Sequence, residues 1–217
     1  MYSLTVNAAF AYVRRAIDEL TSAESIGLLV DPDALDLHKL VEGHIVEAVH
    51  KIHSLAPVIS LEGESAVKET DYTMELQDGV VTLTMKTPTA RILSLKCKDS
   101  TVVLTEMVAE DSAEGRMQLN RYIRGTYDEP TLVLLKKWDG DHLPRMRYYT
   151  TLISDVDKLD FDIEYLPYPA LVEGEVKIAP RMEYAVLNLI VAMVLDSYKE
   201  TTLAEQYRAK VKEYMES

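Results

Sequence analysis

The stretch from Tyr184 to Leu195 constrains the fold of this chain more than any other, because its only polar side chain is that of Asn188. A helix with this composition is apolar on every face and needs protein on all sides. At about 1.5 Å per residue it reaches roughly 18 Å, which is shorter than the ~20 apolar residues that a membrane span requires. We therefore expect a buried core helix and no membrane anchor.

A second helix is expected directly after the first. Pro180 suits the first turn of the apolar helix, where its missing N–H loses no partner. The spacing from Thr202 to Glu205 is that of a capping box, which starts the next helix. Side chains of one face then recur at intervals of four, four and three residues: Leu203, Tyr207, Val211 and Tyr214. The pattern predicts an antiparallel helix pair that the rest of the chain must bury.

Two amphipathic helices are predicted near the N-terminus. The first covers about residues 7–20, with Thr5 or Asn7 as its cap. The second follows Asp31-Pro32 and ends before Pro57. The apolar stripe of the first consists of Phe10, Val13, Ile17 and Leu20, and that of the second of Leu37, Val41, Ile45, Ala48 and Ile52. Both stripes are suited to cover the apolar C-terminal helix.

From Tyr72 onward the hydrophobic period changes from about 3.6 to 2. Asp78-Gly79 is a hairpin turn signal between alternating segments at 72–76 and 81–85. Further strands are expected at 92–98, 101–107, 131–138, 145–152 and 159–166, with turns at 99–100 and 139–140. This density of short strands favours an antiparallel β-sandwich or a small barrel.

The predicted class is therefore α+β, with a helical bundle built from both ends of the chain and a central β domain. The expected boundaries are 1–57 for the N-terminal helices, 58–176 for the β-rich domain and 177–217 for the C-terminal helices.

One segment, 108–127, interrupts the strand pattern. A connection of about twenty residues is long for a compact domain, and such loops are often functional. Its basic and aromatic side chains make it either a partner-contacting arm or an insertion folded over the β domain. The last helix is the other candidate contact surface, and the alternative is that it merely packs on the bundle. The candidate partner-contact residues are Arg116, Arg121, Tyr122, Arg124, Tyr207, Arg208, Lys212 and Tyr214.

The formal charge is −13, from 36 acidic and 23 basic residues. Such a surface repels nucleic acid phosphates and anionic membranes, which argues against a sequence-specific DNA reader. It serves either solubility or a surface that lies near DNA without adhering to it. The single cysteine, Cys97, excludes an internal disulfide and alternates with Leu93 and Leu95, so we expect a buried strand thiol rather than a reactive one. The N-terminus lacks a signal-peptide pattern, which predicts intracellular synthesis.

Metal binding and catalysis have weak sequence support. Four histidines in the second helix scatter around its axis, and only His50 and His53, with Glu47, share a side. Solvated or interface histidines are the expectation, since no further ligand is nominated. There is no phosphate loop, nucleophile elbow or cysteine with a plausible histidine partner, so we expect no enzyme, no cofactor and no metal.

A hydrolase with an unrecognised carboxylate site is the third hypothesis. Its candidate residues are Asp139, Asp141, Asp160 and Asp162. Alternation within one strand explains the last two, because Asp160, Asp162 and Glu164 then line a solvated face. The opposite face, with Phe161, Ile163 and Tyr165, turns to the core.

The order of features resembles the head-to-tail adaptor proteins of short-tailed bacteriophages, of the tail tubular or gatekeeper type. The resemblance covers nearly the whole chain, from the second helix running into Ala56-Pro57 to the terminal helix pair. The short motifs that carry it are Glu129-Pro130-Thr131-Leu132, Tyr148-Tyr149, Tyr165-Leu166-Pro167-Tyr168-Pro169, Ile178-Ala179-Pro180, and Ala204, Tyr207, Ala209 and Tyr214 in the last helix. The segment 108–127 departs from the pattern.

This resemblance implies a structural virion protein. Such adaptors form a homo-oligomeric ring, commonly twelvefold, that docks beneath the portal protein and supports a tail protein or second ring, while DNA passes through the channel. It implies a location in the neck or tail of the virion, after assembly in the host cytoplasm, and no catalytic residues. A different reading of the same chain is a non-viral ligand- or peptide-binding module that dimerises through its helices.

Overall fold

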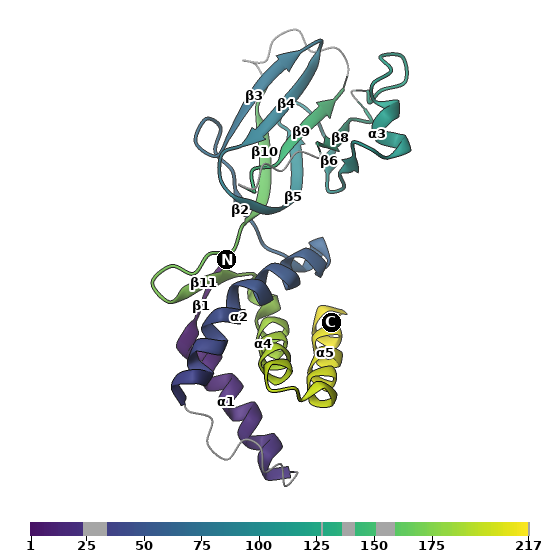
Figure 1. The fold of residues 1–217 in the computed structure, drawn as a ribbon. Helices are drawn as coiled ribbons and strands as arrows, with labels where there is room; N and C mark the ends of the chain where they lie inside the picture. The colour runs from purple at the N-terminus through teal and green to yellow at the C-terminus, as the bar shows by residue number, and fades with distance from the viewer. Residues whose placement is uncertain (24–33, 127, 136–141, 151–158, 217) are drawn as a thin grey trace. The chain divides into compact units, whose positions relative to one another are not determined.

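The computed structural model describes residues 1–23, 34–126, 128–135, 142–150 and 159–216 (Figure 1). It is a mixed α and β structure, which confirms the predicted α+β class at that level. The chain divides into two compact units. A helical unit comprises Met1–Glu62 and Pro169–Ser217, and a β unit comprises Gly63–Tyr168. The helical unit is therefore discontinuous in sequence, with the β unit inserted into it.

The described residues of the helical unit form four α-helices and a pair of short strands. Its elements are β1 (Tyr2–Thr5), α1 (Val6–Ala23), α2 (Ala34–Leu55), the 3₁₀ turn η1 (Val58–Ser60), β11 (Glu175–Ile178), the 3₁₀ turn η2 (Pro180–Met182), α4 (Glu183–Ser197) and α5 (Thr201–Glu216). The helix α4 contacts α1, α2 and α5, and in Figure 1 it lies between α2 and α5.

Burial of α4 confirms the expectation drawn from its composition. Nine of its residues are buried: Ala185, Val186, Leu187, Asn188, Ile190, Val191, Ala192, Val194 and Leu195. Leu189 and Met193 are half-buried, and Tyr184 is 55% exposed. Part of the hydrogen-bonding capacity of Asn188 is satisfied inside the helix, because its Nδ2 donates to the carbonyl oxygen of Tyr184 at 2.7 Å. The helix is thus buried by its own chain, and no neighbouring subunit is needed to cover it.

The N-terminal helices also follow their patterns. The whole predicted stripe of α2 is buried, and in α1 the side chains of Val13 and Ile17 are buried. Thr5, not Asn7, caps α1, since its Oγ1 accepts the N–H of Ala8 at 3.0 Å. The predicted start of α2 at Asp31-Pro32 lies outside the described residues. In α5 the helix begins at Thr201, so Thr202 lies within its first turn instead of serving as the expected cap.

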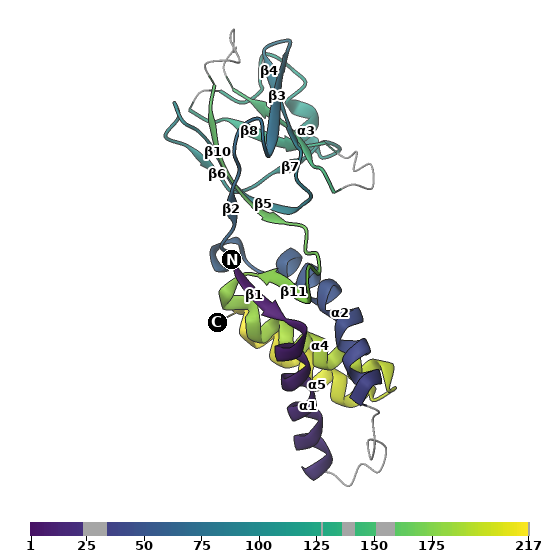
Figure 2. The same cartoon turned by 90° about the vertical axis from the view of Figure 1, so that its left-hand side faces the viewer.

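The pairing of β1 with β11 was not predicted. The two strands run antiparallel, from Tyr2 opposite Ile178 to Thr5 opposite Glu175, and they lie side by side in both views (Figure 1, Figure 2). The N–H of Val6 extends this ladder by donating to the carbonyl oxygen of Gly174 at 2.9 Å. The expected boundary at residue 176 therefore falls inside a strand of the helical unit.

Two sheets build the β unit. One has the order β2 (Glu64–Ser65), β10 (Phe161–Pro167), β5 (Thr89–Cys97) and β6 (Val103–Leu104). The other has the order β3 (Tyr72–Gln77), β4 (Val80–Met85), β9 (Arg145–Tyr149), β8 (Thr131–Leu134) and β7 (Val108–Ala109). The hairpin β3–β4 turns through Asp78 and Gly79, both at positive φ, as a two-residue hairpin of this type requires.

One hydrophobic cluster takes side chains from both sheets, including Leu83 and Met146 from one and Leu95 and Ile163 from the other. Tyr72 is buried among them, and its hydroxyl donates to the carbonyl oxygen of Phe161 at 3.1 Å. Burial raises the pKa of that hydroxyl.

Cys97 lies in the same core. Burial raises the pKa of its thiol, which keeps it protonated and confirms the expected buried strand cysteine.

Three details of the β unit correct the predictions. The ladder is not wholly antiparallel, because β7 pairs with β8 in parallel, Val108 opposite Val133. The strand expected at 101–107 is limited to β6, and β2 was not predicted. The turn expected at 139–140 lies outside the described residues, as do the last residues of the strands expected at 131–138 and 145–152.

Candidate functional site

Of the segment 108–127 the structure describes residues 108–126, which form a lobe that begins at β7. Its helix α3 (Ala113–Met117) starts at Ser112, whose Oγ accepts the N–H of Gly115 at 2.9 Å. The guanidinium of Arg116 donates to the carbonyl oxygen of Asp111 at 2.8 and 3.2 Å. These local bonds fix the first half of the lobe.

The second half is tied to the sheet. Gln118 is buried, and its Oε1 accepts the N–H of Gly125 at 2.7 Å. The hydroxyl of Thr150, next to β9, donates to the carbonyl oxygen of Thr126 at 3.1 Å. Gly115 packs so closely on β7 that a Cβ there would lie 2.2 Å from the carbonyl oxygen of Ala109. The lobe is therefore held rigidly on the β unit.

The lobe nevertheless exposes large apolar side chains. The exposed fractions are 87% for Tyr122, 70% for Leu119, 53% for Ile123 and 50% for Met117. Arg121 lies over the ring of Tyr122, with its Cζ 5.9 Å from the ring centroid. Aromatic, Met and Arg side chains are those enriched at protein–protein interfaces. We name this surface, from Arg116 to Arg124, the arginine lobe.

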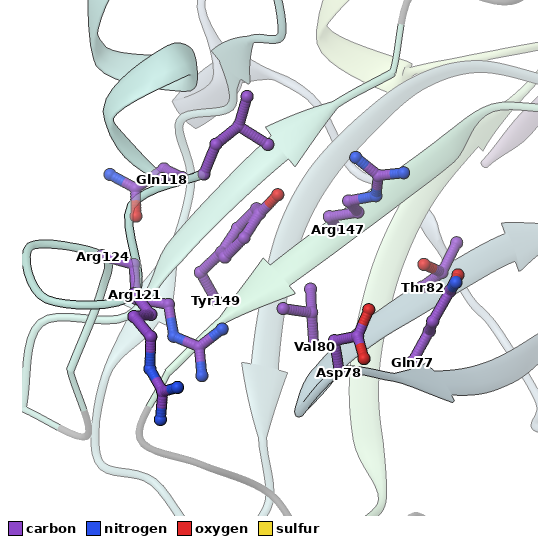
Figure 3. A pocket seen from close by; sticks show the side chains of 10 residues that line it. Gln77, Asp78, Val80, Thr82, Gln118, Arg121, Arg124, Arg147 and Tyr149 are labelled. Atoms are coloured by element: carbon purple, nitrogen blue, oxygen red, sulfur yellow. The ribbon is translucent and has the colours of Figure 1, made fainter.

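A cleft of about 560 Å³ lies beside the arginine lobe on the five-stranded sheet (Figure 3). Two of its residues, Arg147 and Tyr149, alternate on β9, while Tyr148 between them belongs to the core. Thr82 of β4 is paired with Arg147 across the sheet. The lining residues are Gln77, Asp78, Val80, Thr82, Gln118, Leu119, Arg121, Arg124, Arg147 and Tyr149.

The charge of this cleft is opposite to that of the chain. Among its lining residues Asp78 is the only acid, against the three arginines 121, 124 and 147. Arg147 has a carboxylate partner in Glu110, at 3.9 Å. Within the described part of the chain no ion pair involves Arg121 or Arg124. Guanidinium groups stay protonated and present a planar fork of donors, so the cleft is suited to bind carboxylates or other oxyanions.

The sequence nominated Arg121 and Arg124, and the structure brings them together with residues that it did not nominate. Gln77, Thr82, Arg147 and Tyr149 were missed. The alternation of Arg145, Arg147 and Tyr149 was the available signal, because it places two arginines and a tyrosine on the same face of a strand.

The candidate contact residues on the last helix lie in the helical unit. Two of them, Tyr207 and Arg208, are already engaged in contacts within the chain. Tyr207 is 5% exposed, burial raises its pKa, and Lys210 Nζ lies 4.2 Å from its ring centroid. Arg208 bonds the carboxylates of Asp196 and Glu205. Lys212 is exposed, and Tyr214 stacks on Tyr184 with centroids 5.6 Å apart. Lys212 and the Tyr184–Tyr214 pair are therefore the parts of this set open to a partner.

The histidine expectation needs correction at His53. It is fully buried, not solvated, and its Nε2 accepts the N–H of Ala179 at 3.2 Å. Burial, helped by the neighbouring His50, lowers its pKa to about 4. Within the described residues no group of three His, Cys, Asp or Glu side chains is placed to hold a metal ion.

Two candidates of the carboxylate hypothesis, Asp160 and Asp162, lie in a surface ion pair with Lys98. Lys98 Nζ lies 2.6 Å from Asp160 and 3.9 Å from Asp162, and the bond from Lys98 lowers the pKa of Asp160. The predicted alternation is confirmed, since Phe161, Ile163 and Tyr165 are buried. Asp139 and Asp141 lie outside the described residues.

Comparison with protein-family models, with curated proteins and with solved structures finds no match to this chain. Among the described residues, every helix is too short or too polar to traverse a lipid bilayer.

Proposed function

We propose that this chain is a structural subunit of a phage head-to-tail connector. In this proposal it forms a ring, twelvefold in the manner of the adaptors it resembles, beneath the portal protein. It carries a tail protein or second ring, and DNA passes through the channel. The protein resides in the neck of the virion after assembly in the host cytoplasm. It acts by holding other proteins and has no catalytic step.

The observation that carries the proposal is the arginine lobe. A segment that exposes Leu119 and Tyr122 at 70% and 87% leaves apolar surface in water, which monomeric proteins keep scattered. At the same time the lobe is anchored through buried Gln118 and through Gly115, so its shape is set before any partner arrives. A rigid surface of aromatic and Arg side chains is what a protein partner needs for tight contact.

Two further features support the proposal. The helical unit contains both ends of the chain, and the β unit lies between its two parts in the sequence, as the resemblance implies. The net charge of −13 suits a channel wall along which DNA moves with few lasting contacts. The finer architecture of the proposal is a helical bundle and a β-sandwich, and the core shared by the two sheets favours the sandwich over a barrel.

The proposal is tested by mixing the full chain with the portal protein encoded in the same genome and measuring the mass of the product by native mass spectrometry. We expect monomers to become a defined ring on the portal. A chain that ignores the portal, or forms one small oligomer with or without it, contradicts the proposal.

The contact surface is tested in the same measurement with the double variant Leu119→Ser/Tyr122→Ser. The matched control is Val103→Ser, because Val103 is also in the β unit and 52% exposed, but lies outside the lobe. We expect the double variant to lose ring formation and the control to keep it. Equal assembly by both removes the lobe from the interface.

For the last helix, truncation after Tyr198 does not separate a loss of portal contact from a loss of folding. It removes Leu203 and Tyr207 from the core as well as the surface residues. The substitutions Lys212→Glu and Tyr214→Ser probe portal contact without that loss. Normal recruitment of both variants would assign α5 to packing alone.

The second candidate function is a ligand- or peptide-binding module outside any virion. The basic cleft favours it, because a concave site with convergent polar groups is typical of ligand sites. A stable dimer that binds a ligand and does not respond to the portal would favour this function over the connector.

A further inference from the structure

We propose that the basic cleft binds an extended acidic segment of a partner protein, with carboxylates held by Arg121, Arg124 and Arg147. The inference deepens the proposed function in one respect, since it takes the occupant to be a protein of the assembly. The arginine lobe supplies apolar contact area, and the cleft beside it supplies the recognition of charge.

The dimensions of the cleft suit a few side chains of such a segment. Its volume of about 560 Å³ lies within the roughly 300–1,000 Å³ of sites that enclose small ligands. The base is a β-sheet, because Thr82 and Arg147 are paired across β4 and β9. Sites built on strands hold their geometry better than sites built on loops alone. The arginines of the lobe are positioned by the buried Gln118 bond to Gly125.

The arrangement of charge favours carboxylate ligands. Figure 3 shows Tyr149 between the two arginines of the lobe and Arg147, so the cations lie on different sides of the site. An extended segment with carboxylates on alternate residues places its charges on one face, in line with such a spread. Arginine binds each carboxylate through two parallel N–H bonds, which gives both strength and orientation.

Two other arginines of the chain are held by groups of the chain itself. Arg116 is bound to the carbonyl oxygen of Asp111, and Arg208 to two carboxylates. In contrast, Arg121 and Arg124 form no ion pair within the described residues, and Arg147 reaches its carboxylate only at 3.9 Å. Three guanidinium groups that line one cleft repel one another, and carboxylates of a bound ligand relieve that repulsion.

A protein segment fits the cleft better than nucleic acid does. A phosphate backbone is bound by a long basic surface, and the affinity depends on the number of phosphates neutralised. Here three arginines stand next to Asp78 in a concave site, while the acidic remainder of the chain repels a polyanion. Val80 and Leu119 also line the site, and they offer contact to the CH₂ groups of the acidic side chains.

The test measures binding of a short labelled peptide, in which glutamate alternates with valine, to the full chain by fluorescence anisotropy. The comparison probes are the same peptide with glutamine in place of glutamate, and a single-stranded oligonucleotide of similar length. We expect the glutamate peptide to bind at least about tenfold more tightly than either, since about 1.4 kcal/mol corresponds to tenfold and a charged hydrogen bond contributes that much.

The variants are Arg121→Ala/Arg124→Ala and Arg147→Ala, with Arg14→Ala as the matched control. Arg14 has the same charge and is exposed, but it belongs to the helical unit and does not line the cleft. We expect each cleft variant to weaken the glutamate peptide about tenfold and the control to leave binding unchanged. Circular dichroism melting verifies that all variants are folded, and Arg121→Lys/Arg124→Lys restores charge without the fork, so binding should recover only in part.

Four results would overturn the proposal: no binding of the glutamate peptide, equal binding of the glutamine peptide, tighter binding of the oligonucleotide, or equal loss in Arg14→Ala. The peptide assay needs no portal. It can therefore fail while ring assembly succeeds, or succeed while ring assembly fails, and the two proposals are judged separately.

Discussion

The helix α5 and the arginine lobe present the same residue types and use them differently. In α5, Tyr207 is 5% exposed and Arg208 bonds carboxylates of α4 and of its own helix. In the lobe, Tyr122 is 87% exposed and Arg121 contacts only its ring among the interactions of the described residues. Tyrosine and arginine thus indicate a contact surface only where the chain has not already satisfied them itself.

The difference arises from how each element is packed. An amphipathic helix of sixteen residues buries one stripe, and in α5 that stripe includes Tyr207. The lobe has one five-residue helix, α3, and between residues 113 and 123 only Gly115 and Gln118 are buried. Its larger side chains are therefore left in solvent. Substitutions in the two regions should have correspondingly different effects on stability and on binding.

The largest expected difference is between Tyr207→Ala and Tyr122→Ala. Truncating a buried aromatic side chain leaves a cavity, so Tyr207→Ala should lower the free energy of unfolding by about 3 kcal/mol. Tyr122→Ala removes an exposed ring and should change it by less than about 0.5 kcal/mol. Urea unfolding of both variants measures this. Similar losses would mean that the lobe is part of the folding core, and the comparison between the two regions would not hold.

Acid should weaken the helical unit before the β unit, through His53. Its pKa is about 4 in the folded chain and 6.5 ordinarily, so the unfolded chain takes up this proton first as the pH falls. The contribution is fully present above pH 6.5 and is lost between about pH 6.5 and 4, by up to about 3 kcal/mol.

Hydrogen exchange read separately in α2 and in the β strands should show this loss in α2. The variant His53→Gln keeps an acceptor for the N–H of Ala179 but does not titrate, so its stability should be flatter over that range. An unchanged pH dependence in His53→Gln would assign the acid sensitivity to other groups.

Replacing a glycine with alanine should change the stability in opposite directions in the lobe and in α2. Gly115→Ala places a Cβ 2.2 Å from the carbonyl oxygen of Ala109 and should cost about 1–3 kcal/mol, as overpacking does. Gly43→Ala in α2 meets nothing within 4 Å and should stabilise by about 0.5–1 kcal/mol, because alanine is the better helix former. Thermal melting of the two variants checks the signs. A neutral Gly115→Ala would mean that the lobe is not rigidly held.

The smallest effect is expected for the arginines. Arg208→Ala removes a half-exposed link between α4 and α5 and should cost about 0.5–1 kcal/mol. Arg121→Ala should leave stability unchanged, since its charge has no carboxylate partner in the described part of the chain. Equilibrium unfolding at low and high salt separates them, because screening should reduce the loss only for Arg208→Ala.

Local patterns were sufficient to predict the elements that fold on local information. The apolar composition of α4 and the stripe of α2 determined which faces are buried, and the Asp78-Gly79 turn determined the register of β3 with β4. The pairing of Thr82 with Arg147 depends on a third strand, β9, so the sequence of the β3–β4 hairpin alone does not predict it.

The missed elements are short or depend on distant partners. The strand β1 has four residues, and its partner β11 lies more than 160 residues away in the chain. The parallel pairing of β7 rests on two residues. The cleft was missed for the same reason, because the lobe and β9 are brought together only by the fold. The lobe itself was found, since an interruption of a strand pattern is visible in sequence.

The insertion of the β unit into the helical unit has a consequence for synthesis. The ribosome makes α1 and α2 first and then about 130 further residues before α4 begins, which takes on the order of 10 s at usual elongation rates. Throughout that interval the nascent stripes of Ile45 and Val13 have no α4 to cover them. The β unit is continuous and can fold first. The N-terminal helices must therefore wait on the nascent chain, and a chaperone that binds apolar helices would have its longest opportunity there.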